Sequence, residues 1–484
     1  MRPTTLVMVV IALGFGLRLF HLDAQSFWYD EAMSAGIARG TITQILGNDF
    51  YSPHPPLYFL TLHYWIAIGQ SDFAIRLLSA ILGVAGVAGM YSLGKALCDD
   101  TVGLASATIA AIAPYMIFYS QEARMYALVF LLSTMLLLSY ARMLYTDSRR
   151  WWVAYTVLAA LSLYAHLFSG LLLLSLHLHF FARRTPGRKR WGRLAVSDAV
   201  LIFAFAPRLG IFMVQARRVA GDFWIPRPSL AQLFSAPHAF TLSQHVSAKL
   251  VPVAFGVVLF LFMLTLLQVA RELAMRTRDG EVLTLALFAF WCPLLLSFII
   301  SQWRPVYLER TLMVVVPALY FLLGWGMMRP RGRYVNLGLA LLVALFALNA
   351  LHNWYLNPKF GKPPFRAAAR FLQAKADAGE PILHTSDAGF LIFVHYAPGW
   401  GTYLLEGDPA PAIPAETYRL FGGEIIAKEE LVAPRFWLVV ALDNSIEFQM
   451  GLADWFDGHY RLVKSYSFDG IDLLHYDGTL MPQG

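Results

Sequence analysis

The chain has 484 residues, of which 58% are hydrophobic and only 14% are charged, whereas ordinary soluble domains carry about 25% charged residues. A soluble globule of this composition would expose more apolar surface than a monomer tolerates in water, and two cysteines are too few for a disulfide scaffold. The composition therefore indicates an integral membrane protein. We attribute the formal net charge of +7 mostly to basic loops that set the orientation in the membrane, so a nucleic-acid partner is not implied.

The N-terminal apolar run is predicted to be a membrane span, because it is long and Phe20-His-Leu-Asp offers no small-residue cleavage pattern for a signal peptide. A span needs about 20 apolar residues. A shorter apolar stretch, 56–69, lies between Pro55-Pro56 and Gly69-Gln70 and is typical of an interfacial helix. The sequence predicts eleven spans, at residues 4–22, 73–96, 102–120, 125–143, 151–166, 168–182, 194–214, 250–270, 281–301, 311–328 and 334–352.

Basic residues mark one set of loops between these spans. Lys and Arg favour the cytoplasmic side of a membrane, so we expect the N-terminus inside and the end of the chain outside. The loop 23–72 and the tail 353–484 are then extracytoplasmic. The residues that set this orientation are Arg2, Arg142, Arg149, Arg150, Arg183, Arg184, Arg188, Lys189, Arg190, Arg193, Arg271, Arg276, Arg278, Arg329, Arg331 and Arg333.

The tail differs in composition from the rest of the chain, because Lys, Asp, Glu and Pro return and no span is present. We therefore predict two domains: a transmembrane catalytic domain over 1–352, which includes the first external loop, and a small extracytoplasmic α/β domain over 353–484. Hydrophobic periodicity predicts its elements. They are a helix at Phe365–Ala378, strands at Pro381–Thr385, Phe436–Leu442, Tyr460–Ser467 and Ile471–Tyr476, and a helix near 446–456.

The first external loop carries two adjacent acids, Asp30 and Glu31, directly after Trp28 and Tyr29. One interpretation is an interfacial aromatic belt followed by a solvated helix start. The other is a catalytic carboxylate held close to the membrane surface.

A second acid favours the catalytic interpretation. Span three ends at Tyr119-Ser-Gln, and the short turn before span four holds Glu122, Arg124 and Tyr126. A local Glu–Arg pair would contribute little at a wet surface. Together with Asp30, however, Glu122 would supply a second carboxylate to one cavity, as a base and a substrate-orienting partner require.

Arginines on the predicted outer side break the inside-positive pattern. Arg304, Tyr307 and Arg310 precede span ten, and Arg208 follows Pro207 inside span seven. A guanidinium suits a lipid-linked phosphate, because its planar fork binds oxyanions through two hydrogen bonds. The alternative is an arginine that extends to lipid headgroups.

His54 lies in a proline-fixed turn, Ser52-Pro-His-Pro-Pro, where it either points toward the Asp30 cavity or has a structural role. The sequence has no His pair at i, i+4 and no Cys cluster, so a zinc site built from the protein alone is not expected. Asp30 and Glu122 remain possible ligands of a divalent metal ion together with phosphate oxygens. No other cofactor is indicated.

The order of these motifs resembles the GT-C type glycosyltransferases that depend on polyprenyl-phosphate sugars, in the bacterial branch related to protein mannosyltransferases and to the aminoarabinose transferase of lipid A. The resemblance covers most of the first 330 residues. It rests on Asp30-Glu31, His54-Pro-Pro-Leu57 continuing to Phe73-Ala-Ile-Arg76-Leu-Leu-Ser79, Gln121-Glu-Ala-Arg-Met-Tyr126, Arg310 before Pro317, and a C-terminal counterpart that begins at Pro364-Phe-Arg366.

The resemblance implies a polytopic helical membrane enzyme of the cell envelope, in a bacterial inner membrane, with the lipid bilayer and a polyprenyl-phosphate sugar donor as partners and a lipid, glycan or protein acceptor. Asp30 would be the catalytic base and Glu122 the second acid. Arg310, with Arg304 or Arg208, would bind the donor phosphate. Substrate would contact Glu31, His54, Arg124, Tyr126 and Tyr307. The chain departs from the family pattern at Tyr307-Leu-Glu-Arg-Thr311 and at Arg208, which leaves the donor's identity open.

Two other classes compete with a transferase. A flippase or transporter would use the same arginines but needs no base, and it usually has inverted repeats and helices broken at mid-membrane, whereas no internal repeat is found here. A ligase that moves a whole glycan from a diphosphate carrier would share the topology, but it would not predict the paired acids of the first loop.

Overall fold

The structure, a computed structural model, describes residues 3–183, 187–219, 225–328, 333–377, 379–407, 414–441 and 446–480. Arg2, Arg184, Arg329 and Arg331 of the basic loops, and the predicted element ends at Ala378 and Leu442, lie outside these residues. The chain forms two compact units. The first comprises Met1–Leu22, Pro53–Tyr58 and Arg76–Phe360, and the second comprises Asp23–Ser52, Phe59–Ile75 and Gly361–Gly484.

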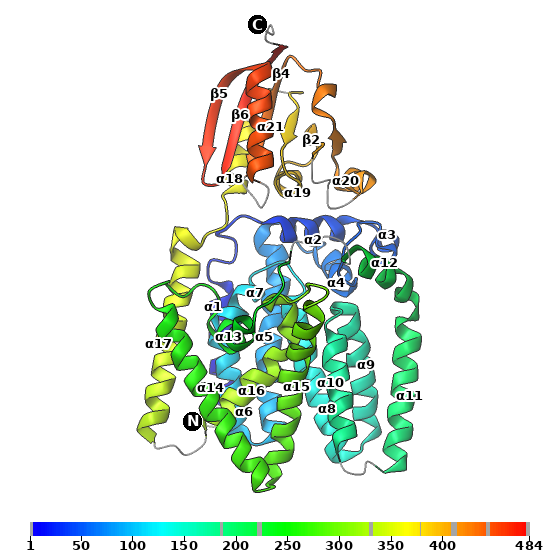
Figure 1. Ribbon diagram of the computed structural model, residues 1–484, viewed down its shortest axis with the longest axis vertical. Helices are drawn as coiled ribbons and strands as arrows, with labels where there is room; N and C mark the ends of the chain where they lie inside the picture. Colours follow the sequence, from blue (N-terminus) through cyan, green and yellow to red (C-terminus); the bar gives the residue numbers. More distant parts are fainter. Residues whose placement is uncertain are drawn as a thin grey trace. The chain divides into compact units, whose positions relative to one another are not determined.

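The described part of the first unit is a helical bundle (Figure 1). Helices α8 and α16 occupy its interior, whereas α11 and α17 lie at its periphery. The elements are α1 (Pro3–Leu19), α5 (Asp72–Leu97), α6 (Asp100–Ile112), α7 (Pro114–Ser120), α8 (Tyr126–Thr146), α9 (Arg149–Ala165), α10 (Ser169–Ala182), α11 (Arg188–Phe205), η1 (Ala206–Arg208), α12 (Leu209–Val219), α13 (Leu230–Leu242), α14 (Val251–Ala274), α15 (Arg278–Ser301), η2 (Glu309–Val315), α16 (Val316–Met327), α17 (Arg333–Leu356) and η3 (Pro358–Phe360).

Each of the eleven predicted spans coincides with a helix or a helix pair, and the predicted polytopic helical fold is confirmed. Not every one of these helices is long enough by itself to be a full span. Among the described residues, seven helices are long and apolar enough to cross a membrane, or eight if the bent pair α6–α7 is one span. The reason is length: α10 has 14 residues, which at 1.5 Å per residue extend about 21 Å, less than the hydrocarbon thickness of about 30 Å.

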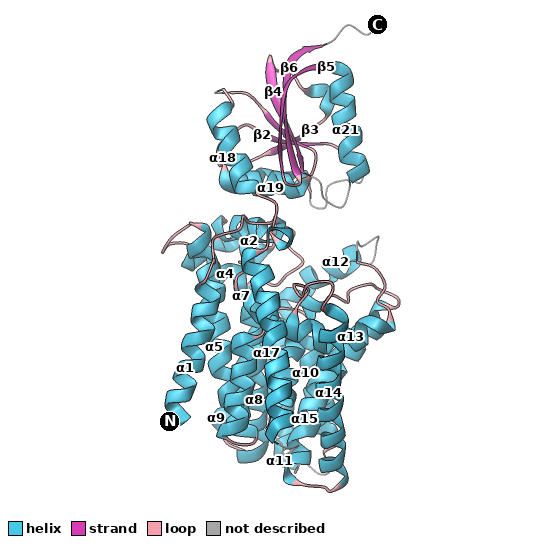
Figure 2. Cartoon of the chain, turned by 90° about the vertical axis from the view of Figure 1, so that its left-hand side faces the viewer, coloured by secondary structure: helices cyan, strands magenta, loops and turns pink. Residues whose placement is uncertain are grey.

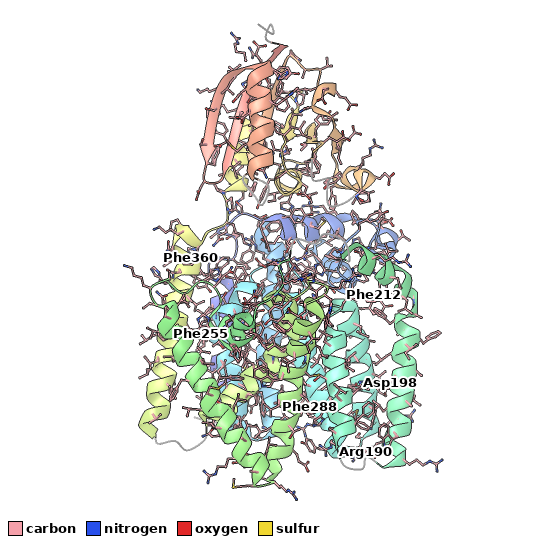
Figure 3. The ribbon with its side chains drawn as sticks, viewed as in Figure 1. Arg190, Asp198, Phe212, Phe255, Phe288 and Phe360 are labelled. Atoms are coloured by element: carbon pink, nitrogen blue, oxygen red, sulfur yellow. The ribbon has the colours of Figure 1, made fainter. Side chains whose placement is uncertain are left out.

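The two ends of the bundle differ in charge. Figure 3 places Arg190, at the start of α11, at the opposite end of the first unit from Phe212 on α12 and Phe360 in η3. At the Arg190 end, Arg190 and Arg193 both pair with Asp147, at 3.8 Å and 2.7 Å between the nitrogen and Oδ1. This basic end is the one that the inside-positive rule assigns to the cytoplasm.

The second unit contains a six-stranded sheet in the order β3-β2-β1-β4-β6-β5. Strands β1 to β4 are parallel, β6 is antiparallel to β4 and β5, and α18 and α21 cover opposite faces (Figure 2). The predicted α/β domain is therefore confirmed. Its elements are α18 (Phe365–Lys375), β1 (Ile382–His384), α19 (Asp387–Tyr396), β2 (Thr402–Leu405), α20 (Ala415–Phe421), β3 (Glu424–Ile426), η4 (Lys428–Glu430), β4 (Arg435–Ala441), α21 (Ile446–His459), β5 (Tyr460–Phe468) and β6 (Ile471–Leu480).

The second unit also contains most of the first loop, with α2 (Tyr29–Arg39), α3 (Ile42–Gly47) and most of α4 (Leu57–Trp65). The expected interfacial helix at 56–69 corresponds to α4. Helix α3 begins with a capping box in which Thr41 accepts a hydrogen bond from the Gln44 main chain, a local signal that stabilises a six-residue helix. The first-loop segments thus share one compact unit with the C-terminal residues. The division into a catalytic domain and an extracytoplasmic domain at residue 352 remains a prediction.

Candidate functional site

A bend between α6 and α7 sets the position of the Glu122 turn. The two helices meet at about 60°, and Pro114 begins α7. Proline has no N–H to donate to the carbonyl of Ala110, four residues earlier. Arg18 on α1 supplies the missing donor: its Nη2 donates to Ala110 O at 2.9 Å, its Nη1 to Ala111 O at 3.1 Å and its Nε to Ser120 Oγ at 3.1 Å.

Gly83 on α5 makes this arrangement possible, because a Cβ atom there would overlap the Ser120 hydroxyl and lie 3.0 Å from Arg18 Nε. The next residue, Gln121, donates through Nε2 to Arg18 O at 3.0 Å and to Phe20 O at 2.7 Å, and its Oε1 accepts from Trp354 Nε1 at 2.6 Å. Through these hydrogen bonds the Gln121 side chain links the turn to the end of α1 and to α17.

Glu122 follows in this turn and is fully buried, while Arg124 is 3% exposed. The Arg124 guanidinium lies 5.9 Å from the centre of the Tyr126 ring, and that ring packs edge-on against Tyr119 at 4.9 Å. The charges of Glu122 and Arg310 both act on the Tyr119 hydroxyl. Glu122, Arg124, Tyr126 and Arg310 thus belong to one neighbourhood of the first unit.

Arg310 enters from η2, where Tyr115 OH donates to the main-chain oxygen of Glu309 at 2.9 Å. His54 joins the group from the other side. Burial lowers the pKa of His54 well below its usual value, and the positive charges of Arg124 and Arg310 lower the pKa further, so the imidazole is neutral. The His54 ring lies 5.7 Å from the ring of His166, which we had not predicted as a site residue.

Three further predicted site residues belong to the first unit: Arg304 and Arg208, expected to bind the donor phosphate, and Tyr307, expected to contact substrate. The Arg304 side chain is exposed and makes no hydrogen bond or ion pair with the residues that the structure describes. Arg208 is buried. Tyr307 is buried, and its hydroxyl donates to Gln232 O at 3.4 Å.

Asp30 and Glu31 begin α2 in the second unit. Glu31 is fully buried, and its Oε2 lies 2.9 Å from Lys362 Nζ. Lys362 also lies 5.5 Å from the centre of the Trp28 ring. Asp30 is partly exposed, and its main-chain oxygen accepts from Ser34 Oγ at 2.8 Å. A buried acid with a lysine partner is favourable for positioning α2, and it leaves Asp30 as the more accessible carboxylate of the pair.

Asp72 links the first-loop residues to the C-terminal residues within the second unit. Its Oδ2 accepts from Tyr396 OH at 2.7 Å and from Arg366 Nη1 at 3.3 Å, and its Oδ1 lies 3.4 Å from His395 Nε2. Phe27, three residues before Asp30, stacks on His395 at 4.5 Å between ring centres. This network holds the segment that leads into α2.

Asp30 and Glu122 belong to different units. Their convergence on one cavity therefore stays a prediction. Within the described residues, no three His, Cys, Asp or Glu side chains form a cluster that could hold a metal ion. The arrangement in the first unit combines a buried guanidinium group on Arg124, a partly buried one on Arg310 and a neutral imidazole on His54 with the buried carboxylate of Glu122, which suits the binding of an oxyanion.

Comparisons with known proteins agree with this chemistry. The family model for dolichyl-phosphate-mannose-protein mannosyltransferases matches residues 53–210, which include His54, Glu122, Arg124 and Tyr126. No curated protein sequence matches the chain.

Among solved structures, the chain is similar to ArnT from Cupriavidus metallidurans in the apo state, with a TM-score of 0.65 and 14% identity over 98% of both chains. It is also similar to the same protein bound to undecaprenyl phosphate, with a TM-score of 0.61, 14% identity, and 98% of this chain and 97% of that chain covered. A third structure is the archaeal oligosaccharyltransferase AglB from Archaeoglobus fulgidus, in complex with an inhibitory peptide and a dolichol-phosphate. Its TM-score is 0.56 and its identity 13%, over 97% of this chain and 74% of that chain.

The prediction of a membrane glycosyltransferase with the GT-C fold is confirmed by these findings together. The family model gives the enzyme class over residues 53–210, and the solved structures give the fold over nearly the whole chain.

Proposed function

We propose that this glycosyltransferase moves a sugar from a polyprenyl-phosphate carrier to a lipid, glycan or protein acceptor at the extracytoplasmic face of a bacterial inner membrane. Solved structures of the same fold hold undecaprenyl phosphate in ArnT and dolichol-phosphate in AglB. The N-terminus and the basic end of the bundle would face the cytoplasm.

The observation that carries the proposal is the group formed by Arg124, Arg310, His54 and Glu122, in which Arg124 and Glu122 are buried and the other two are partly buried. Buried charges persist only where they are paired or where they bind a ligand. Two arginines beside a neutral histidine would stabilise the negative charge that develops on a departing phosphate. A lipid-linked donor explains why such a group is built from helix ends and loops of an apolar bundle.

Asp30 would be the catalytic base. It takes the proton from an acceptor hydroxyl or amine as that atom forms a bond to the anomeric carbon. The bond between the anomeric carbon and the phosphate oxygen breaks, and the electron pair leaves with the polyprenyl phosphate. Glu122 would orient the acceptor. This one-step displacement inverts the anomeric centre and forms no covalent sugar–enzyme intermediate.

The test is a transfer assay with purified protein in lipid nanodiscs and a panel of radiolabelled polyprenyl-phosphate sugars. Asp30→Asn is expected to reduce kcat by about 10²–10⁴-fold, the usual contribution of a positioned base, and to leave donor KM nearly unchanged. Arg310→Ala is expected to raise donor KM most. Arg461→Ala is the matched control, because its guanidinium is exposed in the second unit, where it pairs with Asp477.

Three outcomes would contradict the proposal. Unchanged kcat in Asp30→Asn would remove the base. Turnover with a diphosphate-linked glycan but with no monophosphate donor would favour the ligase class. Movement of the lipid-linked sugar across the bilayer without transfer would favour a flippase.

Full activity in EDTA would argue for a metal-free site, whereas loss of activity that Mg²⁺ or Mn²⁺ restores would place a divalent ion in the reaction.

A further inference from the structure

The loop between α9 and α10 fixes His166 in one orientation. His166 follows the last residue of α9, and its main chain is extended, with φ −159° and ψ 134°. Its N–H donates to Ser162 O at 2.9 Å, and its carbonyl accepts from Ser169 N at 3.0 Å. The side chain is only 4% exposed. The main chain is held by these bonds, and burial together with the hydrogen bond that Nδ1 accepts from Phe168 N restrains the imidazole.

The hydrogen bonds of the ring decide which nitrogen carries the proton. The main-chain N–H of Phe168 donates to His166 Nδ1 at 3.2 Å, so Nδ1 must offer a lone pair. A neutral imidazole then has its hydrogen on Nε2. Within the described part of the chain, this Nε2 has no hydrogen-bond partner, although it is fully buried. A buried donor of this kind needs an acceptor from a ligand or water to explain it.

The surroundings of His166 are cationic. Its ring lies 5.7 Å from the His54 ring at an interplanar angle of 34°. The charge of Arg124 acts on both rings, and the charge of Arg310 acts on His54. An acceptor that approaches these groups is expected to be an anion, because the positive charges of Arg124 and Arg310 attract one.

We propose that His166 is a further binding residue for the phosphate of the lipid-linked donor, to which its Nε2–H donates a hydrogen bond between Arg124 and Arg310. This inference rests on the proposed function of the arginines and adds a fourth element, α9–α10, to the phosphate site. A neutral N–H donor adds a directional hydrogen bond to the phosphate but no third positive charge. It therefore orients the phosphate without strengthening the electrostatic attraction that retains the polyprenyl phosphate product.

The test measures binding of undecaprenyl phosphate, without a sugar, to the full chain in nanodiscs. His166→Leu removes the donor and is expected to weaken the Kd about ten- to a hundredfold, the range for a hydrogen bond to a charged group. His166→Gln keeps an N–H donor at a similar reach and is expected to recover a large part of the affinity. His177→Leu is the matched control, because His177 on α10 pairs with Asp198 at 2.9 Å.

A second measurement covers the case in which His166→Leu fails to fold. Histidine labelled with ¹⁵N in the wild-type chain, with the His166 signal assigned from His166→Gln, is expected to show a changed Nε2–H shift when undecaprenyl phosphate is added. Undecaprenol, which lacks the phosphate, is expected to leave the signal unchanged. Inorganic phosphate shows whether the lipid tail is required for the shift.

The inference is overturned if His166→Leu binds undecaprenyl phosphate as tightly as the wild type, or if the His166 signal does not respond to saturating ligand. Equal losses in the Leu and Gln variants would assign His166 a packing role instead. These results are distinguishable from failure of the proposed function. Lost binding in Arg310→Ala with unchanged binding in His166→Leu rejects only the inference, whereas normal phosphate binding without sugar transfer rejects only the proposed function.

Discussion

Replacing Arg18 with Met removes the hydrogen bonds that hold the α6–α7 bend. The guanidinium makes four bonds, to Gly14 O, Ala110 O, Ala111 O and Ser120 Oγ, at 2.9–3.1 Å. Methionine fills much of the same volume but donates none. The Ala110 carbonyl then loses its donor, because Pro114 has no N–H.

The expected cost follows from these contacts. A buried carbonyl left without a donor costs about 1–3 kcal/mol, and the remaining lost bonds raise this figure, while relief of the buried charge lowers it. We expect a net loss on the order of 3 kcal/mol. Since each kcal/mol shifts the Tm of a large domain by about 2 °C, the Tm of Arg18→Met should fall by about 6 °C.

Thermal unfolding of the chain in nanodiscs, followed by tryptophan fluorescence, measures this shift. Arg461→Met is the control, because that guanidinium is exposed and its pair with Asp477 should contribute less than about 1 kcal/mol. Transfer activity should also fall, since Ser120 precedes the Glu122 turn by two residues. A Tm within the error of the wild type, together with full activity, would refute the role assigned to Arg18.

Three further predictions concern other contacts. Gly83→Ala should destabilise the first unit by about 1–3 kcal/mol and reduce transfer, because its Cβ overlaps Ser120 Oγ; unchanged Tm in the same unfolding assay would contradict this. Asp72→Asn should increase amide hydrogen exchange across α2, since the ion pair to Arg366 loses its charge and the contact with His395 weakens, whereas unchanged protection would show that the network does not hold α2. Burial lowers the pKa of His384 to about 3, while an unfolded histidine titrates near 6.5, so the unfolded state binds more protons between these values. Stability should fall as pH drops from about 6.5 toward 3, and His384→Leu should flatten that part of the unfolding profile; an unchanged slope would contradict it.

Much of the fold could be predicted because its signals are local. The apolar spans, α4, α18 and the longer strands β4, β5 and β6 follow from composition and periodicity. Strands β2 and β3 have four and three residues, too few for a clear alternation. Helix α19 is apolar on most of its surface, so Asp387–Tyr396 shows little helical period. The bend at Pro114 was missed although the proline is itself a local signal of a break, whereas the contacts from Arg18 that compensate for it have no local signature.

The site residues likewise divide into those with a local sequence signal and those without one. Glu122, Arg124 and Tyr126 share one motif, and the structure brings them together with His54 and Arg310. Arg18 carried a signal that we did not use, an arginine inside an apolar span. Pairs such as Lys362 with Glu31, 331 residues apart, have no local signature. His166 was read only as a span boundary, and its importance follows from one hydrogen bond to Nδ1.

The most direct test of the central claim is an experimental structure of the chain bound to undecaprenyl phosphate. The account predicts the phosphate within hydrogen-bond distance of Arg124 and Arg310, with the Asp30 and Glu122 carboxylates opening onto the same cavity beside it. A lipid phosphate bound away from both arginines, or two carboxylates that open into separate regions, would contradict it.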